Sequence, residues 1–228
     1  MDALGAEVPV LGLKMFNIQP LIKGKELFEL VVANGREMTS ENIFRWFFQI
    51  LSGTLHLHTN GYIHRDLKLE NVMWDAKTNS ARIFDFGFTV PRGHAEFKCA
   101  SGTPGYCAPE VIKGKVLISD EFNDGREEKT DAFSAGSIGF ALMMQSVPWL
   151  DEDVTIYDFA GKRNIFMQQL VQNHPGMPEV AAKMADKVIR MCDPDPIKRL
   201  SVRDCVLEIL ADDDLNPLYL DVLPSVEV

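Results

Sequence analysis

The chain has 228 residues, of which 46% are hydrophobic and 25% are charged, and this composition excludes a chain that is disordered throughout. The formal net charge of −10 predicts no nucleic-acid partner, because an acidic surface repels phosphate backbones, and it suits cationic partners better. No apolar run approaches the roughly 18 residues that a membrane-spanning helix needs, so we expect no membrane insertion.

The cysteines and the start of the chain bear on the cellular compartment. The four cysteines include no CxxC pair and no dense framework, which predicts free thiols in a reducing environment rather than zinc ligands or disulfides. The first residues lack the basic region of a signal peptide. These features together favour a cytoplasmic or nuclear protein. The cysteines are Cys99, Cys107, Cys192 and Cys205.

The first part of the chain predicts short strands around one long helix. Apolar residues recur at helical spacing after Thr39-Ser40, where a hydroxyl can cap the first turn, and Gly61 supplies a typical helix stop. The elements expected here are one or two strands within 8–22, a turn at 23–25, a short helix over 26–32, a long helix from 39 or 40 to 60, and strand-like runs at 62–63, 72–74 and 81–84.

The second part is dominated by helices. A long loop rich in Gly and Pro precedes them, and its lack of a clean period indicates a functional or flexible segment. The almost wholly apolar run at 132–144 predicts a helix that is buried all round. The elements expected here are the loop at 87–109, a solvated acidic insertion at 116–130, helices over 132–144, 164–172, 180–192 and 202–210, and an acidic tail after Ala211 that frays.

Three motifs carry the chemistry of this sequence: His64-Arg65-Asp66-Leu67-Lys68-Leu69-Glu70-Asn71, Asp85-Phe86-Gly87 and Ala108-Pro109-Glu110. In this order they resemble the catalytic loop, the DFG motif and the APE motif of the eukaryotic protein kinase family. A lone DFG would be weak, but three motifs in register are a specific signal. The resemblance extends over about residues 21–210. It implies a mainly α fold class, a protein-kinase-like C-terminal lobe with a helical bundle and short β-hairpins.

The resemblance also implies the roles of individual residues. Asp66 would orient the acceptor hydroxyl and take up its proton, and Lys68 would place a positive charge on the migrating phosphoryl group. Asn71 and Asp85 would hold the Mg²⁺ ions that accompany ATP, since oxygen ligands suit a hard cation. Met73 would lie beneath the adenine ring. His64 is expected to pack under Phe86 as a structural residue, without a role as a base.

Further positions imply the type of substrate. Lys68 and the Gly102–Tyr106 stretch are typical of serine/threonine kinases, in which Thr103 would bridge Asp66 and Lys68. Glu26, which precedes Leu27-Phe28, resembles the hinge glutamate of calcium/calmodulin-dependent and related basophilic kinases, where it contacts the ATP ribose and a substrate arginine. Glu70 lies where another such acid meets a substrate arginine. These two acids predict protein substrates with basic motifs. The alternative interpretation is that Glu26 and Glu70 are ordinary solvent-exposed acids.

Other residues concern regulation and structural support. Arg65 beside Asp66 is typical of kinases whose activation loop is ordered by phosphorylation through arginine–phosphate pairing. Thr89 and Ser101 are candidate phosphorylation sites, and plain exposed hydroxyls are an equally good interpretation. By the same resemblance, Asp131 would anchor the catalytic loop, and Arg199 would pair with Glu110.

The small N-terminal lobe of the family is largely absent from this sequence. The residues before the hinge-like segment contain neither a GxGxxG nor a VAIK-like string. We therefore expect a truncated kinase that is weak or inactive as this chain alone, with a partner covering its exposed apolar face. The alternative is a non-catalytic, kinase-derived binding module. The expected division is a remnant of small-lobe strands and hinge at 1–22, the large lobe at 23–210, and an acidic, proline-containing tail at 211–228.

Overall fold

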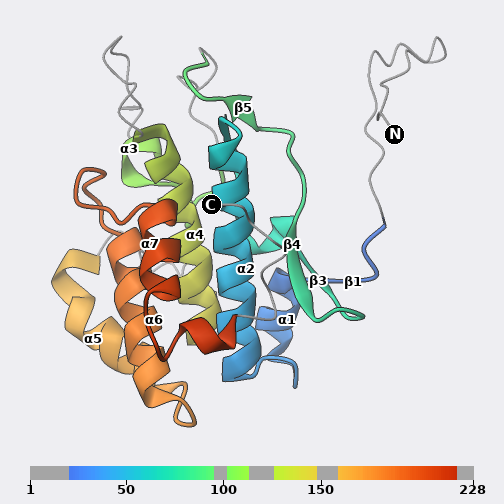
Figure 1. The fold of residues 1–228 in the computed structure, drawn as a ribbon, viewed down its shortest axis with the longest axis vertical. Helices are drawn as coiled ribbons and strands as arrows, with labels where there is room; N and C mark the ends of the chain where they lie inside the picture. The colour runs from blue at the N-terminus through green and yellow to red at the C-terminus, as the bar shows by residue number, and fades with distance from the viewer. Residues whose placement is uncertain (1–20, 95–101, 113–125, 148–158, 220–228) are drawn as a thin grey trace.

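The computed structural model describes residues 21–94, 102–112, 126–147 and 159–219. Within these ranges the protein is mainly helical, with long helices packed side by side and a small sheet beside one of them (Figure 1). The strands expected within 8–20, together with Cys99 and Ser101, lie outside the described residues.

Helix α2 (Ser40–Thr59) is the long helix that the sequence predicts, and it runs through the middle of the described structure (Figure 1). The Thr39 hydroxyl accepts a hydrogen bond from the N–H of Asn42 at 3.3 Å and so caps the first turn. Gly61 has a φ of +79°, the left-handed conformation that glycine adopts without strain, and it turns the chain out of the helix. Aromatic side chains on several faces of the helix are buried, namely Phe44, Trp46, Phe47 and Phe48.

Helix α4 (Arg126–Met144) packs against α2 and against α6 (Pro178–Met191). Gly139 permits this close approach, because a Cβ there would lie 2.6 Å from the ring of Phe47. The helix begins earlier than the sequence predicts, and residues 126–130 belong to it rather than to a solvated insertion. Glu127 is buried, and its carboxylate accepts a hydrogen bond from the Gly93 N–H, which offsets part of the cost of burying a charge. Helices α5 (Phe159–Gln172), α7 (Val202–Leu210) and the short α3 (Pro109–Ile112) complete the bundle.

Two small antiparallel sheets lie against the helices. One has the strand order β1 (Gly24–Glu26), β3 (Val72–Asp75), β4 (Ser80–Ile83), and the other pairs β2 (Tyr62–Ile63) with β5 (Val90–Pro91). The turn predicted at 23–25 is wrong, because Gly24 pairs with Asp75 as part of β1. A Cβ at Gly24 would overlap the carbonyl oxygen of Trp74, so only glycine fits there. Helix α1 (Leu27–Ala33) follows β1 directly.

The described part of the tail packs onto the core instead of fraying. After α7, a single 3₁₀ turn, η5 (Asn216–Leu218), leads to Tyr219. Leu215 and Tyr219 are both fully buried, and the Tyr219 ring stacks on Phe48 with 4.2 Å between centroids. The fraying predicted for the tail is therefore wrong for 211–219.

Two broader expectations can be compared with the described residues. Cys107, Cys192 and Cys205 are all buried, and the prediction of free thiols is confirmed for Cys192 and Cys205. Among the residues described, none of the helices combines the length and the apolar character that crossing a bilayer requires.

Candidate active site

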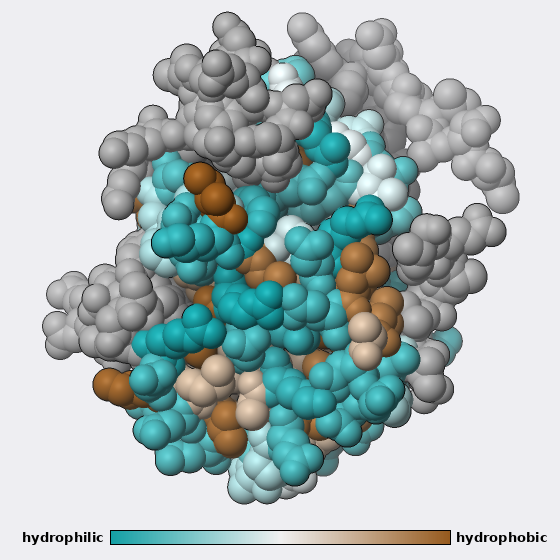
Figure 2. Space-filling view, turned by 60° about the vertical axis from the view of Figure 1, so that its left-hand side comes forward, coloured by the Kyte–Doolittle hydropathy of each residue, from teal (hydrophilic) through white to brown (hydrophobic). Residues whose placement is uncertain are grey.

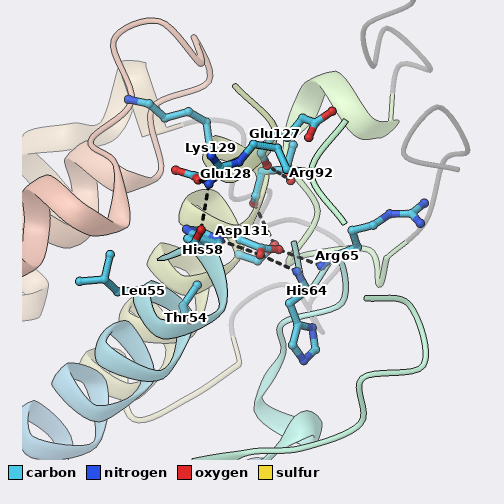
Figure 3. A network of polar contacts seen from close by, with 12 residues as sticks. Thr54, Leu55, His58, His64, Arg65, Arg92, Glu127, Glu128, Lys129 and Asp131 are labelled. Carbon is cyan, nitrogen blue, oxygen red and sulfur yellow. Dashed lines mark hydrogen bonds and ion pairs between the residues drawn. The ribbon is translucent and has the colours of Figure 1, made fainter. Parts of the chain in front are cut away.

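The predicted catalytic loop, residues 64–71, follows β2 and ends with the 3₁₀ turn η1 (Leu69–Asn71), and Asp131 of α4 anchors its start. One oxygen of the Asp131 carboxylate accepts the N–H of His64 at 2.8 Å, and the other accepts the N–H of Arg65 at 2.9 Å (Figure 3). Arg65 has a φ of +72°, which is unfavourable for a residue with a side chain and needs such support. The predicted anchoring role of Asp131 is thus visible as two hydrogen bonds.

His58, at the end of α2, also contacts Asp131. Its Nε2 lies 3.0 Å from Asp131 Oδ2, and both side chains are buried. Burial alone would raise the pKa of Asp131, but the hydrogen bond from His58 and the nearby donors outweigh burial and hold the pKa below its ordinary value. The carboxylate is therefore charged at neutral pH and stays available to the loop. His58 is not among the residues predicted from the sequence.

The residues predicted to perform the chemistry gather around the Asp66 carboxylate. The Thr103 hydroxyl donates to Asp66 Oδ1 at 3.0 Å and accepts from Lys68 Nζ at 3.0 Å, which forms the predicted bridge. Lys68 Nζ also lies 3.1 Å from Asp66 Oδ2, and the Asn71 amide donates to the same oxygen at 3.1 Å. A cation, an amide and a hydroxyl are therefore all held within hydrogen-bond distance of the Asp66 carboxylate.

Asp85, the first residue of the DFG motif, follows β4 at the edge of this cluster. Its φ of +59° and the hydrogen bond from the Gly87 N–H to its Oδ1, at 3.1 Å, fix a tight turn. The N–H of Phe84 donates to the carbonyl of Asn71 at 3.0 Å, which ties this segment to the catalytic loop. The side chain of Asp85 is exposed to solvent.

The two predicted magnesium ligands fit that ion chemically. The Asn71 amide nitrogen is used by Asp66, so its side-chain oxygen remains as an acceptor, and Asp85 contributes a carboxylate. The described residues contain no group of three or more His, Cys, Asp or Glu side chains that could hold a metal by themselves. A cation here would take part of its ligands from water or phosphate, which is usual for Mg²⁺.

His64 lies behind this cluster as a structural residue. Its ring contacts the ring of Phe86 with 5.5 Å between centroids. Burial lowers the pKa of His64 below its ordinary value, although neighbouring carboxylates oppose the effect. The ring is therefore neutral at pH 7, and the packing under Phe86 agrees with the sequence-based expectation.

The hinge-like residues meet at the edge of the three-stranded sheet. Glu26 of β1 is the direct partner of Met73 in β3, so the predicted ribose contact and the predicted adenine contact are neighbours. Turn η1, which carries Glu70, packs against α1 and β1. One carboxylate oxygen of Glu70 is buried and has no hydrogen-bond partner among the described residues. Both acids therefore lie on elements that adjoin one another.

The predicted regulatory residues differ in how exposed they are. Arg65 is half-buried in the loop described above. The Thr89 hydroxyl is buried without a hydrogen-bond partner among the described residues, so the prediction of an exposed hydroxyl there is wrong for this conformation. Phosphorylation of Thr89 would require this segment to open. Ser101 is outside the described residues.

The predicted ion pair between Arg199 and Glu110 is present and supports the APE segment. The guanidinium makes two parallel contacts with the carboxylate, at 2.6 and 2.9 Å. It also donates to the carbonyl oxygens of Lys129 and Asp193, and its side chain has no exposed surface. Four of the five N–H donors of this buried guanidinium are thus used by backbone or carboxylate oxygens.

Comparisons with known proteins agree with this geometry. The family model for the protein kinase domain matches residues 13–209. "Serine/threonine protein kinase OSK3" of Oryza sativa subsp. indica is 32% identical over 191 residues, which cover 83% of this chain and 34% of the relative. "Serine/threonine protein kinase OSK4" of Oryza sativa subsp. japonica matches with the same figures. The chain therefore spans about a third of the length of these curated relatives.

Proposed function

Because the chain belongs to the protein kinase family, we propose that it is the catalytic lobe of a serine/threonine kinase. It transfers the γ-phosphoryl group of ATP to hydroxyls of protein substrates. The observation that carries this proposal is the Asp66–Lys68–Thr103 cluster, in which the predicted acid, cation and bridging hydroxyl are already within hydrogen-bond distance.

The residues divide the reaction among them. The acceptor oxygen forms a bond to the γ-phosphorus while the bond from that phosphorus to the bridging oxygen of ADP breaks, and Asp66 takes the acceptor's proton. Lys68 stabilises the negative charge on the moving group. Asn71 and Asp85 would hold Mg²⁺, which when bound neutralises charge on the ATP phosphates.

We propose that the substrates carry basic residues near the acceptor hydroxyl. Glu26 and Glu70 lie on adjoining elements, and a chain with a formal charge of −10 attracts cationic peptides. Glu26 and Met73 would contact the nucleotide on the side of the sheet.

We propose further that this lobe needs small-lobe residues in addition to its own for efficient transfer. The 228 residues include no GxGxxG and no VAIK-like strand, so the chain itself lacks the usual cover and lysine for the phosphates. Phe86 and Phe88 beside the site are 41% and 49% exposed, which marks an apolar surface for a covering partner.

Phosphate transfer from radiolabelled ATP tests the proposal. The purified chain, alone and mixed with a separately produced kinase small lobe, is offered serine, threonine and tyrosine peptides with and without arginines. We expect transfer to the basic serine and threonine peptides in the mixture, and Asp66→Asn is expected to reduce it by about 10²-fold or more. Asp75→Asn, which changes an acid of the β3–β4 hairpin instead, serves as the matched control.

The same assay separates catalysis from a kinase-derived binding module. No transfer even with the small lobe would contradict the proposal. Tight binding of basic peptides would then support the binding module if neither Mg-ATP nor Asp85→Ala changed that binding. Such binding would use the acids Glu26 and Glu70 without the phosphate site.

A further inference from the structure

Arg92 connects three parts of the protein that the sequence keeps far apart. It lies immediately after β5, where the chain leaves the DFG turn, and its own N–H donates to the carbonyl of Gly61 at 2.8 Å. One guanidinium nitrogen donates to the carbonyl of His58, the last turn of α2, at 2.9 Å. The same nitrogen pairs with the carboxylate of Glu128 in the first turn of α4 (Figure 3).

The next residue makes a second contact with the same helix. The N–H of Gly93 donates to Glu127 Oε2 at 2.8 Å, and Glu127 is only 8% exposed. Two successive residues of the segment are therefore held by two successive acids of α4. A solvent-exposed ion pair alone contributes little, but here a buried carboxylate and backbone groups take part as well.

His58 continues the connection toward the catalytic loop. Its carbonyl is used by Arg92, and its ring contacts Asp131 Oδ2 at 3.0 Å. Asp131 in turn accepts the N–H groups of His64 and Arg65, next to the proposed catalytic Asp66. Glu127 and Glu128 precede Asp131 by four and three residues on α4, so the segment after β5 and the catalytic loop are held by carboxylates of the same helix.

We infer that Arg92 is a positioning residue for phosphoryl transfer. It clamps the segment that follows the DFG motif onto α4 and, through His58 and Asp131, fixes the backbone of the catalytic loop. The catalytic part of this inference depends on the proposed kinase function, whereas the clamp itself is a property of the fold.

Amide hydrogen exchange at His64 and Arg65 tests the clamp without any substrate. We expect Arg92→Ala to accelerate exchange at these two amides by about tenfold, the range expected for coupled neighbours. His58→Phe is expected to have a similar effect, and the double variant is expected to be no faster than the faster single variant, because both residues act along one chain of contacts. Amides in the middle of α6 are expected to exchange as in the unmodified protein.

Arg163→Ala is the matched control, because Arg163 also forms a partly exposed ion pair, with Asp186 at 3.1 Å. It is expected to leave exchange at His64 and Arg65 unchanged. In the mixture with a small lobe, Arg92→Ala is expected to lower kcat by about tenfold and to leave KM for ATP and for peptide within about twofold.

Unchanged exchange at His64 and Arg65 in Arg92→Ala would overturn the inference, and so would a uniform acceleration that includes α6. If exchange responds as expected but the unmodified protein transfers no phosphate, the clamp stands and the proposed kinase function fails. If phosphate is transferred and kcat is insensitive to Arg92→Ala, the positioning role fails and the proposed function stands.

Discussion

Arg199 shows how much a single buried charge depends on its partner. Its guanidinium is fully buried and pairs with a Glu110 carboxylate that is 11% exposed. Glu110→Gln would leave that charge without its counter-charge, so we expect the free energy of unfolding to fall by about 3–5 kcal/mol. Urea denaturation followed by circular dichroism measures the change.

Lys198 provides the comparison from the neighbouring position. Its side chain is 74% exposed and its ammonium lies 3.7 Å from the Asp195 carboxylate, so Lys198→Ala is expected to change the free energy of unfolding by no more than about 1 kcal/mol. If Glu110→Gln and Lys198→Ala changed the free energy of unfolding equally, burial of the Arg199 pair would not increase its contribution to stability.

At the scale of elements, His174 joins the start of α2 to the end of α4. Its Nε2–H donates to the carbonyl of Met143 at 3.0 Å, and its Nδ1 accepts from the Ser40 hydroxyl at 2.9 Å. Burial lowers the pKa of His174 below the ordinary 6.5. Below pH 6.5 the unfolded chain therefore binds a proton that the folded protein does not, and stability falls as the pH falls.

We expect the free energy of unfolding to decrease from pH 7.5 to 5.5 by up to about 1.4 kcal/mol per pH unit for each such histidine. His64, whose pKa burial also lowers, contributes in the same direction. His174→Gln keeps a donor for Met143 and removes one titrating group, so urea titrations of this variant are expected to show a shallower pH dependence. An unchanged slope would show that His174 does not titrate differently in the two states.

The same scale shows what the sequence could and could not predict. The long helix from Ser40 follows from the spacing of its apolar residues, and the helix is present in the structure. The Asp66, Lys68 and Asn71 set follows from the resemblance of one short segment to the kinase catalytic loop, and the three side chains do lie together. The Arg92 contacts join residues 34 and 36 positions apart, and no local pattern marks them. From the sequence alone, the acidic run at 126–130 therefore looks like a solvent-exposed segment. In the folded protein, the acids at the start of α4 lie beside the segment that follows β5 and bind it.

At the scale of the whole molecule, the outer face over α5, α6 and α7 is mainly hydrophilic, and apolar side chains form only small separate patches there (Figure 2). Ion pairs bind the elements of this face together. Arg190 of α6 makes two contacts of 2.7 Å with Glu208 of α7, and Lys183 of α6 pairs with Asp212 and Asp214 of the tail. These contacts hold the tail in place while its apolar side chains reach the core.

Tyr219 makes the described part of the tail, residues 211–219, part of the cooperative unit. Tyr219 stacks on Phe48 and is fully buried, whereas the one hydrogen-bond partner of its hydroxyl among the described residues is the weak acceptor sulfur of Met184, at 3.7 Å. The ring therefore contributes far more than the hydroxyl. Tyr219→Ala is expected to lower the free energy of unfolding by about 3–5 kcal/mol, as for other buried aromatic side chains, and Tyr219→Phe by less than about 1 kcal/mol.

Thermal unfolding followed at two wavelengths, one for helix content and one for aromatic packing, distinguishes a docked tail from a loose one. We expect both signals to change in a single transition that Tyr219→Ala moves to lower temperature and Tyr219→Phe leaves nearly unchanged. A variant Tyr219→Ala with unaltered stability would contradict the docking, because removing a fully buried ring from a packed core leaves a cavity that the surrounding helices α2 and α6 cannot fill without cost.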